Sequence, residues 1–320
     1  MKKNEKMSVA ARLRHKFMTP YFAKRTLSAL FRYVFLLAVV YVIFYPLFIQ
    51  LMSTFMSIDD LHDRTVQLIP AAPTLANYPH VINATRYWEA FRNSMFLSFG
   101  IAIVQTFVAA LVGYGFAKFK FRGRNILFAF VLVTLLVPPH TMLTSMFLYF
   151  RFFDFWGLLG LIGQPIRLTG TFTPMFILAA TGLGLISGLY IFVMRQFYRG
   201  VPDELLDAAY IDGAGVYGTF GRIILPLSVT PMLTVFLLSF AWQWTDTFYS
   251  GMFFGGIHIL PNILGLMPAE FFGVMERIAN LLLSVRLNTA MILIILPLVI
   301  LYLLTQRYFI QGIERSGITG

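Results

Sequence analysis

The chain has 320 residues, of which 58% are hydrophobic, 17% aromatic and 12% charged, and its mean hydropathy is +0.75. This composition excludes an ordinary soluble domain and indicates a membrane protein. The absence of cysteine excludes disulfides, thiolate metal sites and cysteine nucleophiles.

The N-terminal residues 1–32 form a basic tail that carries much of the formal net charge of +11. Its cations include five that are suited to contact anionic lipid headgroups: Arg12, Arg14, Lys16, Lys24 and Arg25. The net charge therefore requires no nucleic-acid partner. The apolar run that follows is too long for a cleaved signal peptide and is predicted to be an uncleaved membrane anchor.

Six stretches contain no Asp, Glu, Lys or Arg and reach about 20 residues or more, the length that crosses a bilayer as a helix. They are 33–58, 93–117, 125–150, 168–194, 223–245 and 287–306. A seventh uncharged run, Thr247–Ala269, contains several glycines and prolines and is predicted to be an extracytoplasmic loop, either open or partly re-entrant. The sequence thus predicts an all-α polytopic membrane protein with six transmembrane helices.

The cations are distributed unequally between the two sides of these six spans. Eighteen of the 25 lysines and arginines fall in the N-terminal tail, in the connections after the second and fourth spans, and after the last span. The positive-inside rule then predicts that both termini are cytoplasmic. The expected organisation is a cytoplasmic tail at 1–32, a membrane domain at 33–310 with a cytoplasmic loop at 201–226, and a cytoplasmic tail at 311–320.

No motif for catalysis is found. The sequence lacks G-x-x-x-x-G-K-[ST] and G-x-S-x-G, so the chain has no ATP site or nucleophile elbow of its own and is not expected to be an enzyme. Its histidines are scattered and predict no metal site: His15, His62, His80, His140 and His258. The charge-free spans offer no relay of ionisable groups, which disfavours an ion-coupled secondary transporter but leaves it as the alternative.

A glycine string lies in DAAYIDGAGVYGTFGRIILP, where Gly213, Gly215 and Gly218 have the spacing G-x-G-x-x-G. A dinucleotide site would need a preceding strand. Instead, Pro202 suits a first helical turn and Gly213 a C-terminal stop, where a side chain would be strained by a positive φ. The sequence predicts a short helix, a glycine hinge, and a second helix that begins near Gly218. Such a helix between two spans is either a docking element or a plain surface loop.

The same stretch resembles the EAA loop of permease subunits in ATP-binding-cassette (ABC) importers, E-A-A-x-x-x-G followed nine residues later by I-x-L-P. Asp207, Ala208, Ala209 and Gly213 keep this spacing, with Asp in place of Glu, and the second element is Ile223, Leu225 and Pro226. Further stretches resemble MalG-type subunits of carbohydrate importers: RNSMFLS at 92–98, GYGFAKFKFRGRNILF at 113–128, RQFYRGVPDELLDAAYIDGA at 195–214 and QRYFIQGIERSGITG at 306–320.

The resemblance implies the type I importer permease fold in a prokaryotic cytoplasmic (inner) membrane. The implied partners are the lipid bilayer, a second homologous permease, two ABC ATPase subunits and an extracytoplasmic solute-binding protein. No cofactor would bind this chain directly, because ATP and Mg would be held by the ATPases. The implied ATPase-docking residues are Glu204, Asp207, Ala208, Ala209, Gly213 and Pro226.

The end of the fifth predicted span, SFAWQWTDTFYS, resembles a W-N-(D/E)-F element of the same family. Aromatic faces beside hydrogen-bonding groups suit a sugar ring, so an oligosaccharide or related sugar is the expected substrate. The candidate substrate-path residues are Asn93, Trp242, Gln243 and Asp246. Trp242 and Trp244 equally fit an aromatic belt, and Asn93 and Ser94 equally fit interhelical hydrogen bonding. A membrane sensor that uses the loop for docking is a further alternative.

Overall fold

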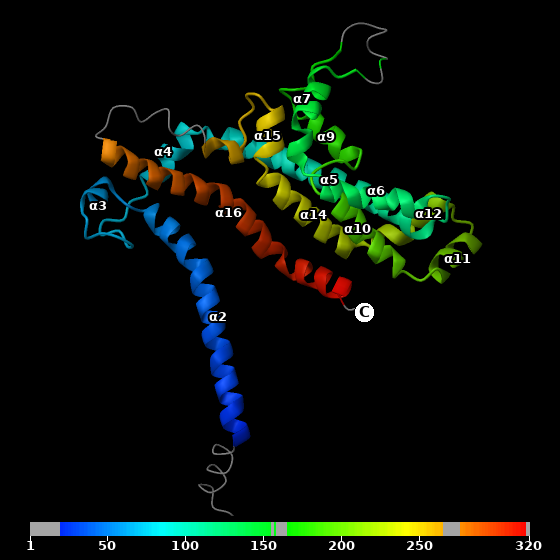
Figure 1. The fold of residues 1–320 in the computed structure, drawn as a ribbon, viewed down its shortest axis with the longest axis horizontal. Coiled ribbons are helices and arrows are strands. Elements are labelled where there is room, and N and C mark those ends of the chain that lie inside the picture. The colour runs from blue at the N-terminus through cyan, green and yellow to red at the C-terminus, as the bar shows by residue number, and fades with distance from the viewer. Residues whose placement is uncertain (1–19, 155–156, 158–164, 265–275, 318–320) are drawn as a thin grey trace, which may run out of the picture. The chain divides into compact units, whose positions relative to one another are not determined.

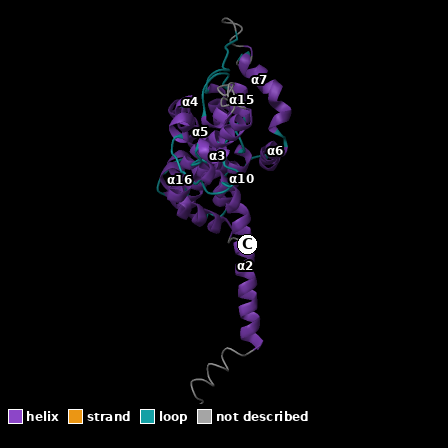
Figure 2. Cartoon of the chain, turned by 90° about the vertical axis from the view of Figure 1, so that its left-hand side faces the viewer, coloured by secondary structure: helices purple, strands orange, loops and turns teal. Residues whose placement is uncertain are grey.

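The computed structural model describes residues 20–154, 157, 165–264 and 276–317, which form helices joined by loops (Figures 1 and 2). Outside the helices, one isolated β-bridge joins Phe153 to Ile166 within these residues. The chain divides into two compact units, Met1–Ala76 and Asn77–Gly320.

The first unit contains the long helix α2 (Pro20–Ser53) and the short helix α3 (Ile58–His62). Helix α2 begins within the predicted basic tail and includes Lys24 and Arg25, whereas Arg12, Arg14 and Lys16 lie outside the described residues. It ends before Ile58, the predicted end of the first span. A capping box between Ser57 and Asp60 starts α3, because each side chain accepts a hydrogen bond from the other residue's backbone N–H.

In the second unit, α5 (Tyr87–Lys118) is the central helix and packs against α10 (Ser187–Arg199) and α14 (Val229–Trp244) (Figure 1). Small residues allow α5 and α10 to approach closely. A Cβ added at Gly113 would lie 2.8 Å from the Cβ of Met194 and 2.9 Å from the backbone N of Arg195. Close contact between helix backbones at small residues is the usual way in which membrane helices associate.

Within the described part of the chain, three helical segments are long and apolar enough to cross a membrane: Lys24–Ser53, Tyr87–Lys118 and Asn280–Arg307. A fourth results if Val216–Leu227 and Val229–Trp244, which meet at an angle of 76°, count as one span. The last of the three belongs to α16 (Glu276–Gly317), which packs against α14. This helix continues through residues 311–317 of the predicted C-terminal tail, and residues 318–320 lie outside the described residues.

Neither the third nor the fourth predicted span is a continuous helix. Residues 125–150 are divided into α6 (Arg124–Leu136), a 3-10 turn (Pro139–Met142) and α7 (Leu143–Arg151). The Pro138-Pro139 pair explains this break, because proline cannot continue an α-helix from within. Residues 168–194 are divided into α9 (Thr173–Ala180) and α10, separated by 181–186, where Gly182 has φ +72°.

The remaining helices of the second unit are short. They are α4 (Asn77–Ala84), α11 (Glu204–Ile211), α12 (Val216–Thr219), a π-helical turn (Phe220–Ile224), α13 (Leu225–Leu227) and α15 (Phe248–Phe253). As far as Leu264, the uncharged run that begins at Thr247 contains α15 and turns but no helix of spanning length. Its residues 265–269 lie outside the described part of the chain.

Candidate functional site

The loop at 201–226 begins with α11, as the sequence predicted, and this helix ends in a Schellman motif. The backbone N–H of Ala214 donates to the carbonyl of Ala209 (2.9 Å), and that of Gly213 donates to the carbonyl of Tyr210 (3.0 Å). Gly213 has φ +80°, which confirms the expected positive φ at this position. Because α11 is a helix and not a strand, the glycine string does not have the structural context of a dinucleotide site.

The predicted docking residues do not all face the same way. Glu204, Asp207 and Ala208 are exposed, as is Gly213. Ala209 is buried within the chain, one turn after Leu206, which packs into an apolar cluster that contains Tyr114, Tyr198 and Phe220. Of the two alanines expected to allow close approach of a partner, only Ala208 is accessible here, because residues three apart share a helix face and that of Ala209 is turned inward.

Exposed apolar side chains accompany these residues and were missed by the sequence analysis. Ile211 and Tyr217 are 86% and 89% exposed, and Leu205, Tyr210 and Val216 are also exposed. Apolar side chains gathered on one short loop are typical of a protein interaction surface. The helical pattern alone could not reveal them, because exposure depends on which face packs against the rest of the chain.

The loop is joined to α14 through a sharp bend. Helix α12 starts at Val216, close to the predicted start near Gly218, and the helical path turns by 76° between Leu227 and Val229. Ser228 lies buried at this bend, where its hydroxyl donates to the carbonyl of Leu225 (3.0 Å) and accepts from the hydroxyl of Tyr198 (3.2 Å). Pro226 lies at this bend and not on α11. Its position there suits it to shape the path of the chain between the loop and α14.

The candidate substrate-path residue Asn93 has a structural hydrogen bond. Its Nδ2 donates to the carbonyl of His258 (2.9 Å), while the hydroxyl of Ser94 accepts from the backbone N–H of Leu260 (2.8 Å). Both side chains therefore attach the start of α5 to the loop that follows α15. Asn93 and Ser94 therefore have the hydrogen-bonding role that was the alternative to lining the substrate path, but their partners lie in a loop and not on another helix.

The residues at the end of α14 have distinct surroundings. Trp242 is half exposed, whereas Trp244 is buried and its Nε1 donates to the carbonyl of Ile294 (3.0 Å). Gln243 is also buried. The carboxylate of Asp246 accepts three backbone N–H groups at the start of α15, from Phe248 (3.1 Å), Tyr249 (3.1 Å) and Ser250 (2.9 Å). Asp246 is thus a helix cap.

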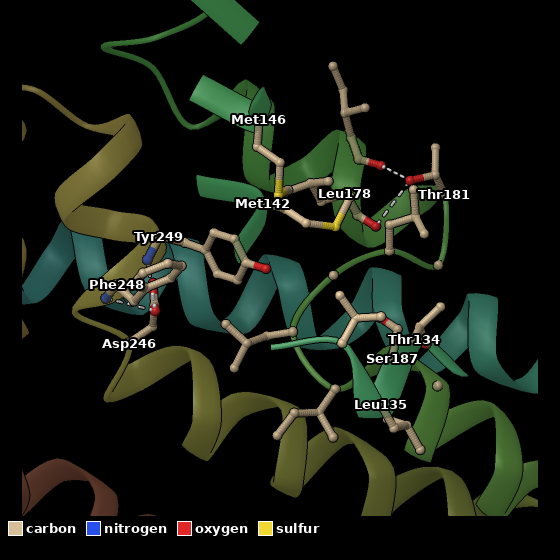
Figure 3. Close-up of a pocket in the computed structure, with 18 of the residues that line it drawn as sticks. Thr134, Leu135, Met142, Met146, Leu178, Thr181, Ser187, Asp246, Phe248 and Tyr249 are labelled. Carbon is tan, nitrogen blue, oxygen red and sulfur yellow. Dashed lines mark hydrogen bonds between the residues drawn. The ribbon is translucent and has the colours of Figure 1, made fainter. Parts of the chain in front are cut away.

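A cavity of about 1120 Å³ lies between the α6–α7 region, the 181–188 segment and the start of α15 (Figure 3). Its lining includes Trp242 and Asp246 but neither Asn93 nor Gln243. Most of the lining is apolar, and its polar groups include the hydroxyls of Thr134, Thr181 and Ser187. Polar residues within long apolar runs are the sequence signal that could have identified these three.

One wall of this cavity is held by Gln105, in the middle of α5. Its Nε2 donates to the carbonyl of Leu185 (3.2 Å) and to the hydroxyl of Ser187 (3.0 Å), and its Oε1 accepts from the hydroxyl of Ser239. The side chain thereby joins α5, the break before α10, and α14. Ile186, at the end of that break, has φ +56°, a strained conformation for a β-branched residue.

Comparison with solved structures defines the class of protein first. The chain matches, with a TM-score of 0.71 and 19% identity, one chain in the crystal structure of a bacterial ABC transporter involved in the import of the acidic polysaccharide alginate. The match covers 89% of this chain and 98% of that chain, so the fold is that of a membrane chain of such a transporter.

The family follows from the sequence. Residues 105–315 match the model of the binding-protein-dependent transport system inner membrane component, and the chain belongs to this family. It is 27% identical to the arabinooligosaccharides transport system permease protein AraQ of Halalkalibacterium halodurans, over 88% of this chain and 93% of the relative. It is 27% identical to the sn-glycerol-3-phosphate transport system permease protein UgpE of Yersinia pestis, over 90% and 96%.

Proposed function

We propose that this chain is the permease subunit of an ATP-driven importer for an oligosaccharide or a related sugar. The observation that carries the proposal is the EAA-like loop, in which a helix with exposed Asp207 and Ala208 ends at a glycine of positive φ. Membership of the family of inner membrane components supports it. A second homologous permease, two ABC ATPases that hold ATP and Mg, and an extracytoplasmic binding protein complete the proposed importer.

In the proposed topology the chain crosses the membrane six times, with both termini and the loop at 201–226 in the cytoplasm. The pairs α6–α7 and α9–α10 then each form one broken span. The distribution of lysines and arginines supports this orientation. Because the chain has no cysteine, single introduced cysteines are unique labels. Lys120→Cys should react with an impermeant maleimide only from the cytoplasmic side, and Ala76→Cys only from outside; the reverse pattern would contradict the topology.

In the proposed mechanism, α11 sits in a groove on an ATPase. Ala208 allows close approach, Asp207 and Glu204 contact a cation or backbone donors, and the apolar residues Ile211 and Tyr217 are buried by the partner. Leu206 fixes α11 to the cluster that includes Tyr114 of α5. Closure of the ATPases then displaces α11 and tilts the membrane helices, so that access alternates between the two sides.

The sugar is proposed to pass along the cavity that Trp242 and Asp246 line. An exposed indole face is suited to stack on a sugar ring. Among the residues that the structure describes, the lining of the cavity contains no Lys or Arg, which favours a neutral sugar over glycerol 3-phosphate, the substrate named for UgpE.

Uptake by cells that lack the chain, with and without a plasmid copy, tests the function. A panel of labelled oligosaccharides and glycerol 3-phosphate should reveal plasmid-dependent uptake of a sugar that stops when ATP is depleted. Uptake that survives ATP depletion while a proton or sodium gradient is maintained would favour the ion-coupled alternative. Plasmid-dependent uptake of glycerol 3-phosphate alone would correct the substrate class.

A further inference from the structure

The cytoplasmic loop is attached to α5 by one buried cation. Lys118, the last residue of α5, places its Nζ 2.6 Å from Oδ1 of Asp203 and donates a hydrogen bond to the carbonyl of Val201 (2.5 Å). The lysine side chain is only 8% exposed, whereas that of Asp203 is 78% exposed. The ammonium group therefore has few alternatives to these two protein acceptors, since a buried polar group without partners is costly.

The local sequence explains why the acceptors are available. Val201, Pro202 and Asp203 form the connection between α10 and α11. Asp203 occupies the N-cap position of α11, where an aspartate usually accepts hydrogen bonds from the first turn. Here its side chain makes no cap hydrogen bond and reaches Lys118 instead. The side chain thus serves a contact between helices and not the capping of its own helix.

The lysine also fixes the charge state of its partner. The hydrogen bond and the positive charge of Lys118 lower the pKa of Asp203 below its ordinary value of 3.8. The carboxylate remains ionised at neutral pH, and the contact weakens as the pH falls below that ordinary value.

A second cation connects the neighbouring helix ends. The guanidinium of Arg195 on α10 lies 3.9 Å from the ring centroid of Phe128 on α6, and its Nε donates to the carbonyl of Phe116 on α5 (3.4 Å). The ends of α5, α6 and α10 are therefore tied to one another independently of Lys118. Lys118 adds the polar connection from this group of helix ends to the start of α11.

We propose that Lys118 is a positioning residue for energy coupling, which makes α5 follow the start of α11 when the ATPases move it. The proposal rests on the proposed function, because it assumes that an ATPase displaces α11. The burial of Leu206 in the apolar cluster holds one face of α11, and the Lys118 contact fixes its N-cap residue, so that a pull on the loop is transmitted instead of being absorbed by local unwinding.

The test uses the full importer, reconstituted in proteoliposomes, with the variants Lys118→Met and Lys118→Arg. Lys120→Met is the matched control, because it removes the same charge from an exposed position two residues away. We expect Lys118→Met to retain the ATPases but to lower the sugar transported per ATP hydrolysed by about 5-fold or more, the lower end of typical coupling between sites. Lys118→Arg should restore much of this ratio and Lys120→Met should leave it unchanged.

A measurement on the purified chain tests the contact without reference to transport. The backbone N–H groups of Leu206 and Asp207 both donate to the carbonyl of Asp203 (2.9 and 3.0 Å). Their hydrogen exchange should be faster in Lys118→Met than in Lys120→Met.

Unchanged hydrogen exchange in Lys118→Met would show that the contact of Lys118 with Asp203 and Val201 does not stabilise the start of α11. An unchanged ratio of transport to ATP hydrolysis would overturn its role in coupling, as would loss of the ATPases from Lys118→Met alone. If the unsubstituted chain retains no ATPase, the proposed function fails instead. The hydrogen-exchange measurement still decides whether the contact of Lys118 with Asp203 and Val201 stabilises the start of α11.

Discussion

Substitution of Gly213 provides the most quantitative test of the proposed ATPase-docking role of the loop at 201–226. An added Cβ would meet no atom within 4 Å, so the cost of Gly213→Ala comes from the backbone conformation at φ +80° and not from a clash. A left-handed conformation costs an L-residue about 1–2 kcal/mol. A cost of this size shifts the equilibrium between the intact and the unwound end of α11 toward the unwound end by up to about 5- to 30-fold. The apparent affinity for an ATPase that requires the intact end falls by up to the same factor.

Gly215 is the matched control for this substitution. It also has open space around it but lies in an ordinary extended conformation with φ −70° and ψ 169°. Titration of the ATPase against the chain in nanodiscs should show weaker binding for Gly213→Ala, little change for Gly215→Ala, and partial recovery in Gly213→Asn, because asparagine tolerates this conformation better. Equal affinities for the two alanine variants would refute the reasoning.

Further substitutions separate structural roles from transport roles. Gln105→Leu leaves the carbonyl of Leu185 and two hydroxyls without this partner. It should destabilise the protein by about 1–3 kcal/mol per group left unsatisfied, seen as a lower Tm. An unchanged Tm would mean that water or a neighbouring group replaces the glutamine amide. Asp246→Ala removes the cap of α15 and should cost about 0.5–2 kcal/mol, while a loss of uptake without any fall in Tm would favour a direct substrate contact. Trp244→Phe should lower the Tm through its lost indole hydrogen bond, whereas Trp242→Phe should weaken sugar uptake at unchanged Tm; the opposite pattern would assign Trp242 to packing.

Local patterns predicted the backbone conformation of the loop at 201–226 well. The helix at α11, its stop at Gly213 and the positive φ there all follow from residues within one short stretch. Local patterns do not reveal that Ala208 is exposed while Ala209 is buried. That distinction depends on the burial of Leu206 in a cluster that includes Tyr114 and Phe128, which are distant in the sequence.

The uncharged runs 125–150 and 168–194 show where counting charges fails to predict a continuous helix. An uncharged run reports an apolar environment but not helix continuity, and Pro138 and Gly182 interrupt two such runs. The break before α10 is further held by Gln105, a contact that spans 80 residues and has no local signature. Asn93 and Asp246 were candidates for the path because they are polar. Their hydrogen bonds to His258 and to the start of α15 give both residues a structural role, and their part in a substrate path stays a prediction.

The loop at 201–226 is proposed to bind an ATPase. The most direct measurement is purification of the tagged chain from its native membrane in mild detergent, followed by mass spectrometry of the proteins that accompany it. Ala208→Glu places a charge on the accessible face of α11, and Ala76→Glu makes the same change at an exposed residue of a loop proposed to be extracytoplasmic. Binding of an ATPase at this loop predicts a second permease and an ATPase with the unsubstituted chain and with Ala76→Glu, and loss of the ATPase alone with Ala208→Glu. A chain that purifies alone yet supports uptake, or an ATPase retained equally by both variants, would contradict it.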